Sequence, residues 1–140
     1  MSNSSLQKNN AFDNSILTVK ENSELNIDSS VFEENFSFDM GGVIRGDYSW
    51  TKIRIKNSNF TKNGAVNGGA FAVLYQSYLT CENCMMTNNF AVTGAVGFAH
   101  LHGRIEFYEC KIEENIAISV PVIEFFDCRN GYQIISNCEI

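Results

Sequence analysis

Hydrophobic and polar positions repeat along this chain at a nearly constant spacing. Each copy begins with an apolar residue, and in the first five copies an asparagine stands three positions later. A match that recurs over the whole chain indicates a repeat architecture. The sequence numbers of successive apolar positions differ by 26, 28, 26, 26 and 28. These positions, which we name the anchors, are Leu6, Phe32, Phe60, Met86, Ile112 and Ile140.

The segment before each anchor alternates apolar and polar residues with the period of two that is typical of β-strands. Ile53 and Ile55, which precede the anchor Phe60, are one example. The alternation then slips by one residue, and such a slip moves side chains to the other face of a strand unless the chain bends. We therefore expect a bend near Asn57 and at the equivalent positions of the other repeats.

Three columns of equivalent residues are predicted to face the interior, and the anchors themselves form one of them. An apolar column five residues before the anchors contains Ile27, Ile55, Cys81, Phe107 and Ile135. A column of small residues, the Ser/Cys ladder, contains Ser4, Ser30, Ser58, Cys84, Cys110 and Cys138. Stacked amides can hydrogen bond from one repeat to the next. We therefore expect an Asn ladder of Asn9, Asn35, Asn63, Asn89 and Asn115.

Glycine pairs follow two of these asparagines, at Gly41 with Gly42 and at Gly68 with Gly69. Glycine adopts positive φ angles and permits close backbone approach, so each pair predicts a corner that leads into a further strand. Each repeat then comprises three short strands and three corners. One repeat cannot bury its own apolar face, whereas stacked copies bury a common core. The pattern predicts an all-β, single-stranded parallel β-helix (a solenoid) of about five turns, each of roughly 26–28 residues.

One β-helix segment accounts for residues 1–140. The chain opens at residues 3–6 and closes at 137–140 in the same phase of the repeat, so it spans five whole turns. Solenoids that end in water carry polar or helical caps, and we recognise no cap at either end. We expect a fragment of a longer solenoid; the alternative is that identical chains stack end to end into a fibre.

Two repeats carry a complete motif pair, FEENFSFDMGGVI at 32–44 and FTKNGAVNGGAF at 60–71. They resemble the Phe-x-x-Asn and Gly-Gly-Ala-Ile repeats of the chlamydial polymorphic outer-membrane proteins, and similar repeats in protist surface proteins of the pectin-lyase-like superfamily. Later repeats replace the glycine pair, by Gly94 with Ala95 and by Val120 with Pro121. The resemblance implies a right-handed β-helix at the cell surface or outside the cell, used as a passenger, adhesin or stalk. It implies no catalytic residue.

Composition narrows the classes of function. The net charge is −6 and the ten basic residues are scattered, which argues against nucleic acid as a partner because binding to phosphates needs clustered Lys and Arg. No apolar run approaches the roughly 18–20 residues that span a bilayer, so we expect no membrane insertion. The polar N-terminal residues contain no apolar core of a signal peptide.

Two groups of residues have the spacing of metal sites. Cys81 and Cys84 form a Cys-x-x-Cys motif, as in zinc and redox sites. Both face the predicted core and no second such motif exists, so we interpret them as buried thiols, with a disulfide between neighbouring turns as the alternative. His100 and His102 share one strand face. No carboxylate stands at the matching positions of the preceding repeat, and we interpret both as exposed surface residues.

Carbohydrate chemistry is the main alternative function. Glycoside hydrolysis needs two carboxylates at a fixed separation. Glu33 with Glu34 and Glu113 with Glu114 are adjacent in sequence and lie two or more turns apart. We predict no catalytic, cofactor or metal site, and no cofactor. A fragment of a polysaccharide lyase or glycoside hydrolase, or a carbohydrate partner, would require a groove with two carboxylates and a basic residue.

The third predicted strand of each turn is apolar on both faces. Its outward positions would form an exposed strip of Ala72, Leu74, Phe98 and Phe126. Such strips mark contact surfaces, so we expect a structural or interaction segment that packs laterally against another copy or a neighbouring domain. Asn59 and Asn3 lie in Asn-x-Ser/Thr sequons and are candidate glycosylation sites. A third sequon, at Asn35, belongs to the Asn ladder.

Overall fold

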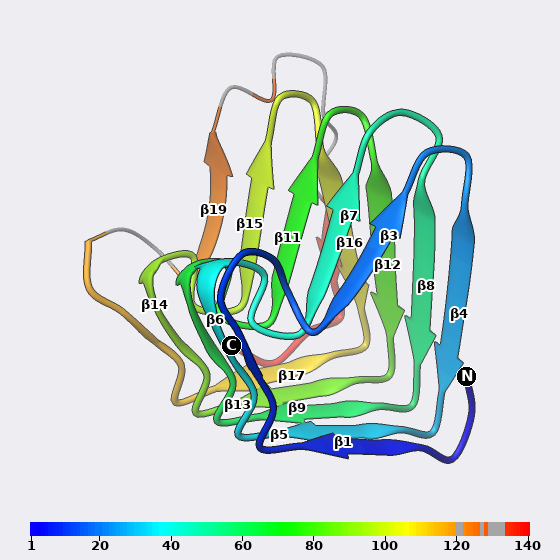
Figure 1. The fold of residues 1–140 in the computed structure, drawn as a ribbon. Helices are drawn as coiled ribbons and strands as arrows, with labels where there is room; N and C mark the ends of the chain where they lie inside the picture. Colours follow the sequence, from blue (N-terminus) through cyan, green and yellow to red (C-terminus); the bar gives the residue numbers. More distant parts are fainter. Residues whose placement is uncertain (120–121, 127, 129–133) are drawn as a thin grey trace.

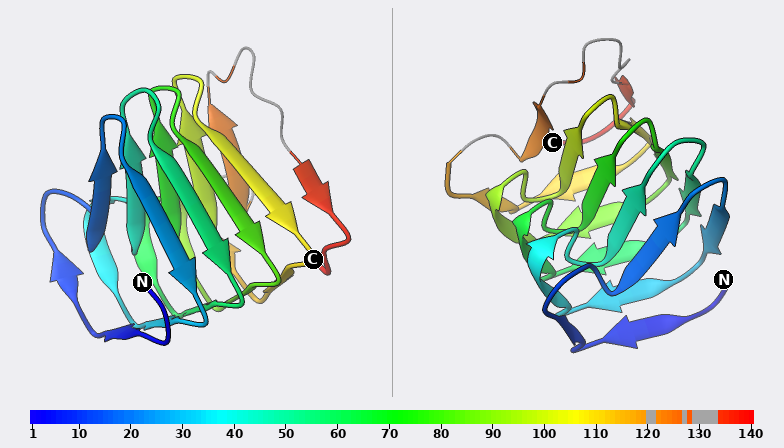
Figure 2. Two further views of the ribbon diagram at one scale, coloured as in Figure 1. Left: turned by 90° about the vertical axis from the view of Figure 1, so that its right-hand side faces the viewer. Right: turned by 45° about the horizontal axis from the view of Figure 1, so that its top comes forward.

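The computed structural model describes residues 1–119, 122–126, 128 and 134–140. In this part of the chain every regular element is a β-strand, and equivalent strands of successive turns pair in parallel (Figure 1). The chain winds through five turns, which follow one another from the blue end to the red end in Figure 2. The predicted all-β parallel β-helix is therefore confirmed.

The strands form four sheets of five strands each, numbered here in chain order. Sheet 1 contains β1 (Ser5–Gln7), β5 (Val31–Glu33), β9 (Asn59–Thr61), β13 (Met85–Thr87) and β17 (Lys111–Glu113). Sheet 2 contains β2 (Asn10–Ala11), β6 (Phe36–Met40), β10 (Gly64–Asn67), β14 (Phe90–Thr93) and β18 (Ile116–Ala117). Sheet 3 contains β3 (Leu17–Lys20), β7 (Ile44–Asp47), β11 (Phe71–Leu74), β15 (Gly97–His100) and β19 (Ile123–Phe126). Sheet 4 contains β4 (Glu24–Asp28), β8 (Lys52–Lys56), β12 (Tyr78–Glu82), β16 (Arg104–Tyr108) and β20 (Ile134–Ser136).

Each turn has four strands, so the prediction of three was wrong. The unpredicted strand belongs to sheet 2 and lies between the Asn ladder and the glycine corner. Its inward residues, such as Ala65 and Ala91, are small, and its outward neighbours are large. The segment therefore does not show the pattern of large inward residues that marks the other strands.

The two repeat lengths have a structural cause. Phe60 pairs with Phe32 on one side and with Met86 on the other, and the step from Phe32 is longer by two positions. The longer turn has one extra residue in β6, where the register shifts and Asn67 lies opposite Met40. Its second extra residue lies in the connection 48–51, which is one residue longer than the equivalent connection of the next turn. Both insertions leave the pairing of the anchors intact.

The core fills the space between the sheets. The four anchors of the middle turns are buried, namely Phe32, Phe60, Met86 and Ile112. The rings of Phe32 and Phe60 stack with centroids 4.7 Å apart. The anchors therefore form the continuous interior column that their spacing predicts.

The end of the solenoid departs from this prediction. Ile135 pairs in register with Phe107, yet it is 44% exposed because it belongs to the last described turn. The last anchor, Ile140, is 74% exposed for the same reason. The predicted burial of Ile135 was wrong, whereas Ile140 was expected at an open face of the stack.

The corners use the backbone conformations that the sequence predicts. Asn57 and its equivalents bend with positive φ between sheets 4 and 1, where the alternation slips. Gly68, at the corner before β11, has φ +71, and a Cβ there would lie 2.0 Å from the carbonyl oxygen of Phe71. Glycine is therefore required at this corner. Val120 and Pro121, which replace the glycine pair in a later repeat, lie outside the described residues.

Candidate functional site

The Asn ladder lies in the interior at the corner between sheets 1 and 2. The side-chain amide of each member donates to the Oδ1 atom of the next, at 2.9 to 3.1 Å, from Asn9 through Asn35, Asn63 and Asn89 to Asn115. The same amides also donate to backbone carbonyls, as Asn63 does to Phe32 at 2.9 Å. These hydrogen bonds tie neighbouring turns together and leave the ladder with a structural role.

The Ser/Cys ladder lies at the corner between sheets 4 and 1. In the early turns a backbone N–H donates to the next hydroxyl, as from Ser4 to Ser30 at 3.2 Å and from Ser30 to Ser58 at 3.1 Å. In the later turns thiols occupy these positions, and the N–H of Cys110 lies 3.4 Å from the Sγ atom of Cys138.

All five cysteines are free thiols, which gives no support to the disulfide alternative. Burial raises the pKa of Cys81. At Cys84 a hydrogen bond with Cys110 opposes the shift, but a hydrogen bond with Cys81 together with burial raises the pKa to about 12. A thiol, unlike a thiolate, is a poor nucleophile and metal ligand, so the geometry favours buried, unreactive side chains at this Cys-x-x-Cys motif.

The strip expected on sheet 3 is not an exposed surface. Ala72, Leu74 and Phe98 are buried, and of the four predicted residues only Phe126 is exposed. Their strands do turn these side chains outward, but the corner that leads from sheet 2 folds over them. A Cβ built on Gly68, for example, would lie 3.2 Å from the Cβ atom of Phe98.

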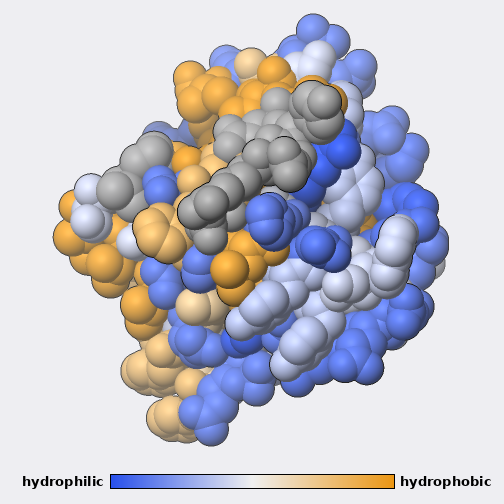
Figure 3. Space-filling model, turned by 90° about the horizontal axis from the view of Figure 1, so that it is seen from above, coloured by the Kyte–Doolittle hydropathy of each residue, from blue (hydrophilic) through white to orange (hydrophobic). Residues whose placement is uncertain are grey.

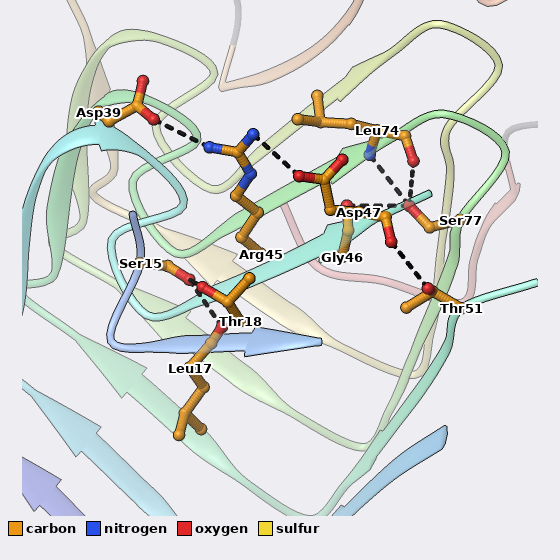
Figure 4. A network of polar contacts seen from close by, with 10 residues as sticks. All are labelled: Ser15, Leu17, Thr18, Asp39, Arg45, Gly46, Asp47, Thr51, Leu74 and Ser77. Carbon is orange, nitrogen blue, oxygen red and sulfur yellow. Dashed lines mark hydrogen bonds and ion pairs between the residues drawn. The ribbon is translucent and has the colours of Figure 1, made fainter. Parts of the chain in front are cut away.

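A polar network lies on the same outer side one turn earlier (Figure 4). The guanidinium of Arg45 donates to Asp39 at 2.9 Å and to Asp47 at 3.0 Å, and it lies between the two carboxylates. Ser77, on the next turn, donates to the carbonyl oxygen of Gly46 at 2.9 Å. The network joins the corner of sheet 2 to sheet 3 and to the next turn, so its geometry supports a structural role.

The exposed apolar surface lies instead on sheet 2. Its outward columns, which we name the apolar face, contain Phe12, Phe36, Phe38, Val66, Phe90, Val92, Ile116 and Ile118. Phe12 is 75% exposed, Phe38 54% and Ile118 79%. In Figure 3, hydrophobic surface gathers on the left-hand side, where β6 and β14 lie in Figure 1. A strand with small residues inside and large apolar residues outside has its apolar side facing water.

Aromatic packing makes the apolar face compact. Phe12 and Phe38 stack with centroids 5.1 Å apart, and Phe36 meets Phe38 edge to face at 4.8 Å. Phe90 lies across Gly64, where a Cβ would come within 2.2 Å of its ring, and this brings it to 5.8 Å from Phe36. The two columns contain no charged residue.

Charged residues border the apolar face. Asp39 follows Phe38 on β6, its side chain is 41% exposed, and it pairs with Arg45. On the neighbouring corner, Glu34 lies 3.8 Å from Lys8 and 3.6 Å from Lys62. These three side chains come from successive turns and form the alternating charge column that their sequence positions indicate.

The two candidate glycosylation sites differ in accessibility. Asn3 is exposed, and Asn59 is half-buried on β9. Asn35, in the third sequon, is buried within the Asn ladder. Of the three, Asn3 is the most accessible.

Metal and carboxylate chemistry finds little support in the described residues. They contain no cluster of three or more side chains able to hold a metal ion. His102 is exposed, as expected, whereas His100 is half-buried. A hollow of about 470 Å³ in the last turns is lined by Glu113, Glu114 and Glu139, but by no described Lys or Arg. The groove that a carbohydrate-active enzyme requires is not formed there.

No helix in the described ranges is long and apolar enough to cross a membrane.

Comparison of this chain with protein-family models, with curated proteins and with solved structures finds no match.

Proposed function

We propose that this β-helix is a non-catalytic interaction segment, a rigid rod that associates laterally with a second copy of itself through the apolar face. The observation that supports this most directly is the exposure of large apolar side chains on sheet 2 in every turn. The motif resemblance adds support for an adhesin-like or stalk-like role in a protein of the cell surface or extracellular space.

The size of the apolar face suits a stable contact. An aromatic side chain buries about 150–250 Å², so the exposed fractions of Phe12 (75%), Phe38 (54%) and Phe90 (45%) alone amount to roughly 260–440 Å² of apolar surface. The exposed parts of Val66, Val92, Ile116 and Ile118 add to this area. The largest apolar patch on a typical monomer is about 300–600 Å². A standard protein interface buries about 800 Å² on each partner. The apolar face alone therefore approaches the area that one side of a stable dimer needs.

The net charge of the chain favours a second copy of the chain as the partner that covers the apolar face. Two chains of net charge −6 repel one another, and the repulsion is weakest where they approach through surfaces without charged side chains. The apolar face is such a surface. Its columns repeat with the turn spacing of about 4.8 Å, so two copies related by a twofold axis present matching rows of side chains.

Sedimentation velocity tests this proposal. We expect the chain to form dimers or larger species in a concentration-dependent manner, and Phe38→Glu to weaken association more than ten-fold because it would bury an unpaired charge. Gln7→Glu, an exposed position on sheet 1, adds the same charge elsewhere and should change little. Both variants should retain the wild-type circular dichroism spectrum.

A wild-type chain that stays monomeric at millimolar concentration would contradict the proposal, as would association that Phe38→Glu leaves unchanged. Binding to lipid vesicles without self-association would show that the apolar face has a different occupant.

A further inference from the structure

The connection between sheets 3 and 4 contains an irregularity that stacking of turns does not require. Four residues, 48–51, join β7 to β8, whereas three residues make this connection in each of the next two turns. Trp50 lies in the longer connection, is 73% exposed and has φ +65. The equivalent residues of the next two turns, Gln76 and His102, have φ +63 and +67, so this conformation is common to the row of connections. The extra residue and the exposed indole are what distinguish this turn.

A hollow of about 370 Å³ lies beside this connection. It is lined by Trp50, Thr51, Lys52, Gln76, Ser77, Tyr78, His102 and Arg104. Among the described residues, the lining includes Lys52, Arg104 and a histidine and no carboxylate, although acidic residues outnumber basic ones in the chain by 16 to 10. Arg104 is paired with the carboxylate of Glu106, so Lys52 supplies the excess positive charge of the hollow.

The floor and one wall of the hollow are held in place. Buried Thr51 donates to the carbonyl oxygen of Asp47 at 2.9 Å. The guanidinium carbon of Arg104 lies 5.1 Å from the centre of the Tyr78 ring. Both of these side chains bind the carboxylate of Glu106, which is 2% exposed. Tyr78 and Arg104 are thus oriented before any ligand arrives, which lowers the entropic cost of binding.

Lys52 lines the same hollow, and its ammonium group can contact a ligand. Lys52 makes no ion pair with any residue in the described ranges, because Glu24, the acid beside it on sheet 4, pairs with Arg54. Lys52 interacts with the charge of Glu24 without a direct ion-pair contact, so its ammonium group can bind an anionic ligand without first breaking one.

We propose that this hollow binds a small organic anion whose ring has an apolar face. The exposed indole of Trp50 suits a ring. Lys52, and Arg104 where it lies over the Tyr78 ring, suit a carboxylate or phosphate. A volume of about 370 Å³ falls within the range of small-molecule sites. Aromatic carboxylates, nucleoside phosphates and acidic sugars share this chemistry, and the experiment separates these three sources.

Tryptophan fluorescence provides a site-specific test because Trp50 is the single tryptophan of the chain. The chain is titrated with 4-hydroxybenzoate, with adenosine 5′-monophosphate and with glucuronate, each beside its uncharged analogue. We expect a saturable change in Trp50 emission with at least one anion, and binding at least ten-fold weaker for the analogue. The anion that binds shows whether the hollow accepts an aromatic carboxylate, a nucleoside phosphate or an acidic sugar.

Two variants show where the ligand binds. Lys52→Gln should weaken binding at least five-fold, whereas Lys56→Gln, on the same strand and outside this hollow, should leave it unchanged. Phe38→Glu should also bind as the wild type does, so this inference and lateral association can fail separately. Absence of a saturable response to all three anions at 10 mM, or full binding by Lys52→Gln, would overturn the inference.

Discussion

Glu106 shows how a carboxylate on an outward strand position becomes structural. Burial alone would raise its pKa, but hydrogen bonds from Tyr78, Tyr108 and Arg104 outweigh burial and hold the pKa below its ordinary value of 4.5. A carboxylate whose pKa is lowered on folding stabilises the protein fully above its unfolded pKa, and this stabilisation is lost as the pH falls through the folded value.

We expect Glu106→Gln to lower the free energy of unfolding at pH 7 by about 1–3 kcal/mol, because it weakens these charge-assisted hydrogen bonds. The variant should also lose less stability than the wild type between pH 7 and pH 3. Urea unfolding at the two pH values measures both effects. Glu82→Gln, which removes an exposed ion pair with Lys56, is the control and should cost less than about 1 kcal/mol. Equal pH dependence in Glu106→Gln and wild type would contradict the assignment.

At the scale of elements, the sequence predicts the strands whose large residues are buried. It does not predict the strands whose large residues face outward. The spacing of the anchors gives the parallel pairing and the number of turns. The repeat pattern does not predict the strands of sheet 2, because large residues there, such as Phe36, Phe38 and Phe90, face water instead of the core. The alternation of large and small residues along these strands is nevertheless present in the sequence. Burial of Ala72 and Phe98 depends on the path of a corner over sheet 3, which a periodic pattern does not encode.

The Asn ladder supports a prediction about turn pairing. Asn63→Ala removes hydrogen bonds to the turns on both sides and leaves buried backbone and amide groups without partners. We expect a loss of about 2–4 kcal/mol in the free energy of unfolding. Asn9→Ala, at the exposed end of the ladder, should cost less than half as much. Chemical denaturation of the two variants compares them, and equal losses would argue against cooperation along the ladder.

At the scale of the whole molecule, the two columns of the apolar face contain no charged residue while the chain carries −6. If the apolar face carries lateral association, no interfacial ion pair is broken by salt, and screening reduces the repulsion between copies. The ligand hollow could not be predicted from the repeat, because it depends on the residue that lengthens the connection 48–51 and thus departs from the repeat.

We therefore expect association to strengthen as sodium chloride rises from 0.05 to 0.5 M. Sedimentation equilibrium at the two salt concentrations measures the change, and the circular dichroism spectrum should stay constant. Weaker association at high salt would show that opposite charges, rather than apolar contact, hold the copies together.

The lengthened connection 48–51 has a consequence for engineering. Lys52 still pairs with Tyr78 immediately after the insertion, as Tyr78 does with Arg104 in the next turn. The extra residue is therefore absorbed within its own connection and does not shift the strands that follow. Foreign peptides grafted into this row of connections would be displayed side by side, one turn apart, on a scaffold whose strand register they leave unchanged.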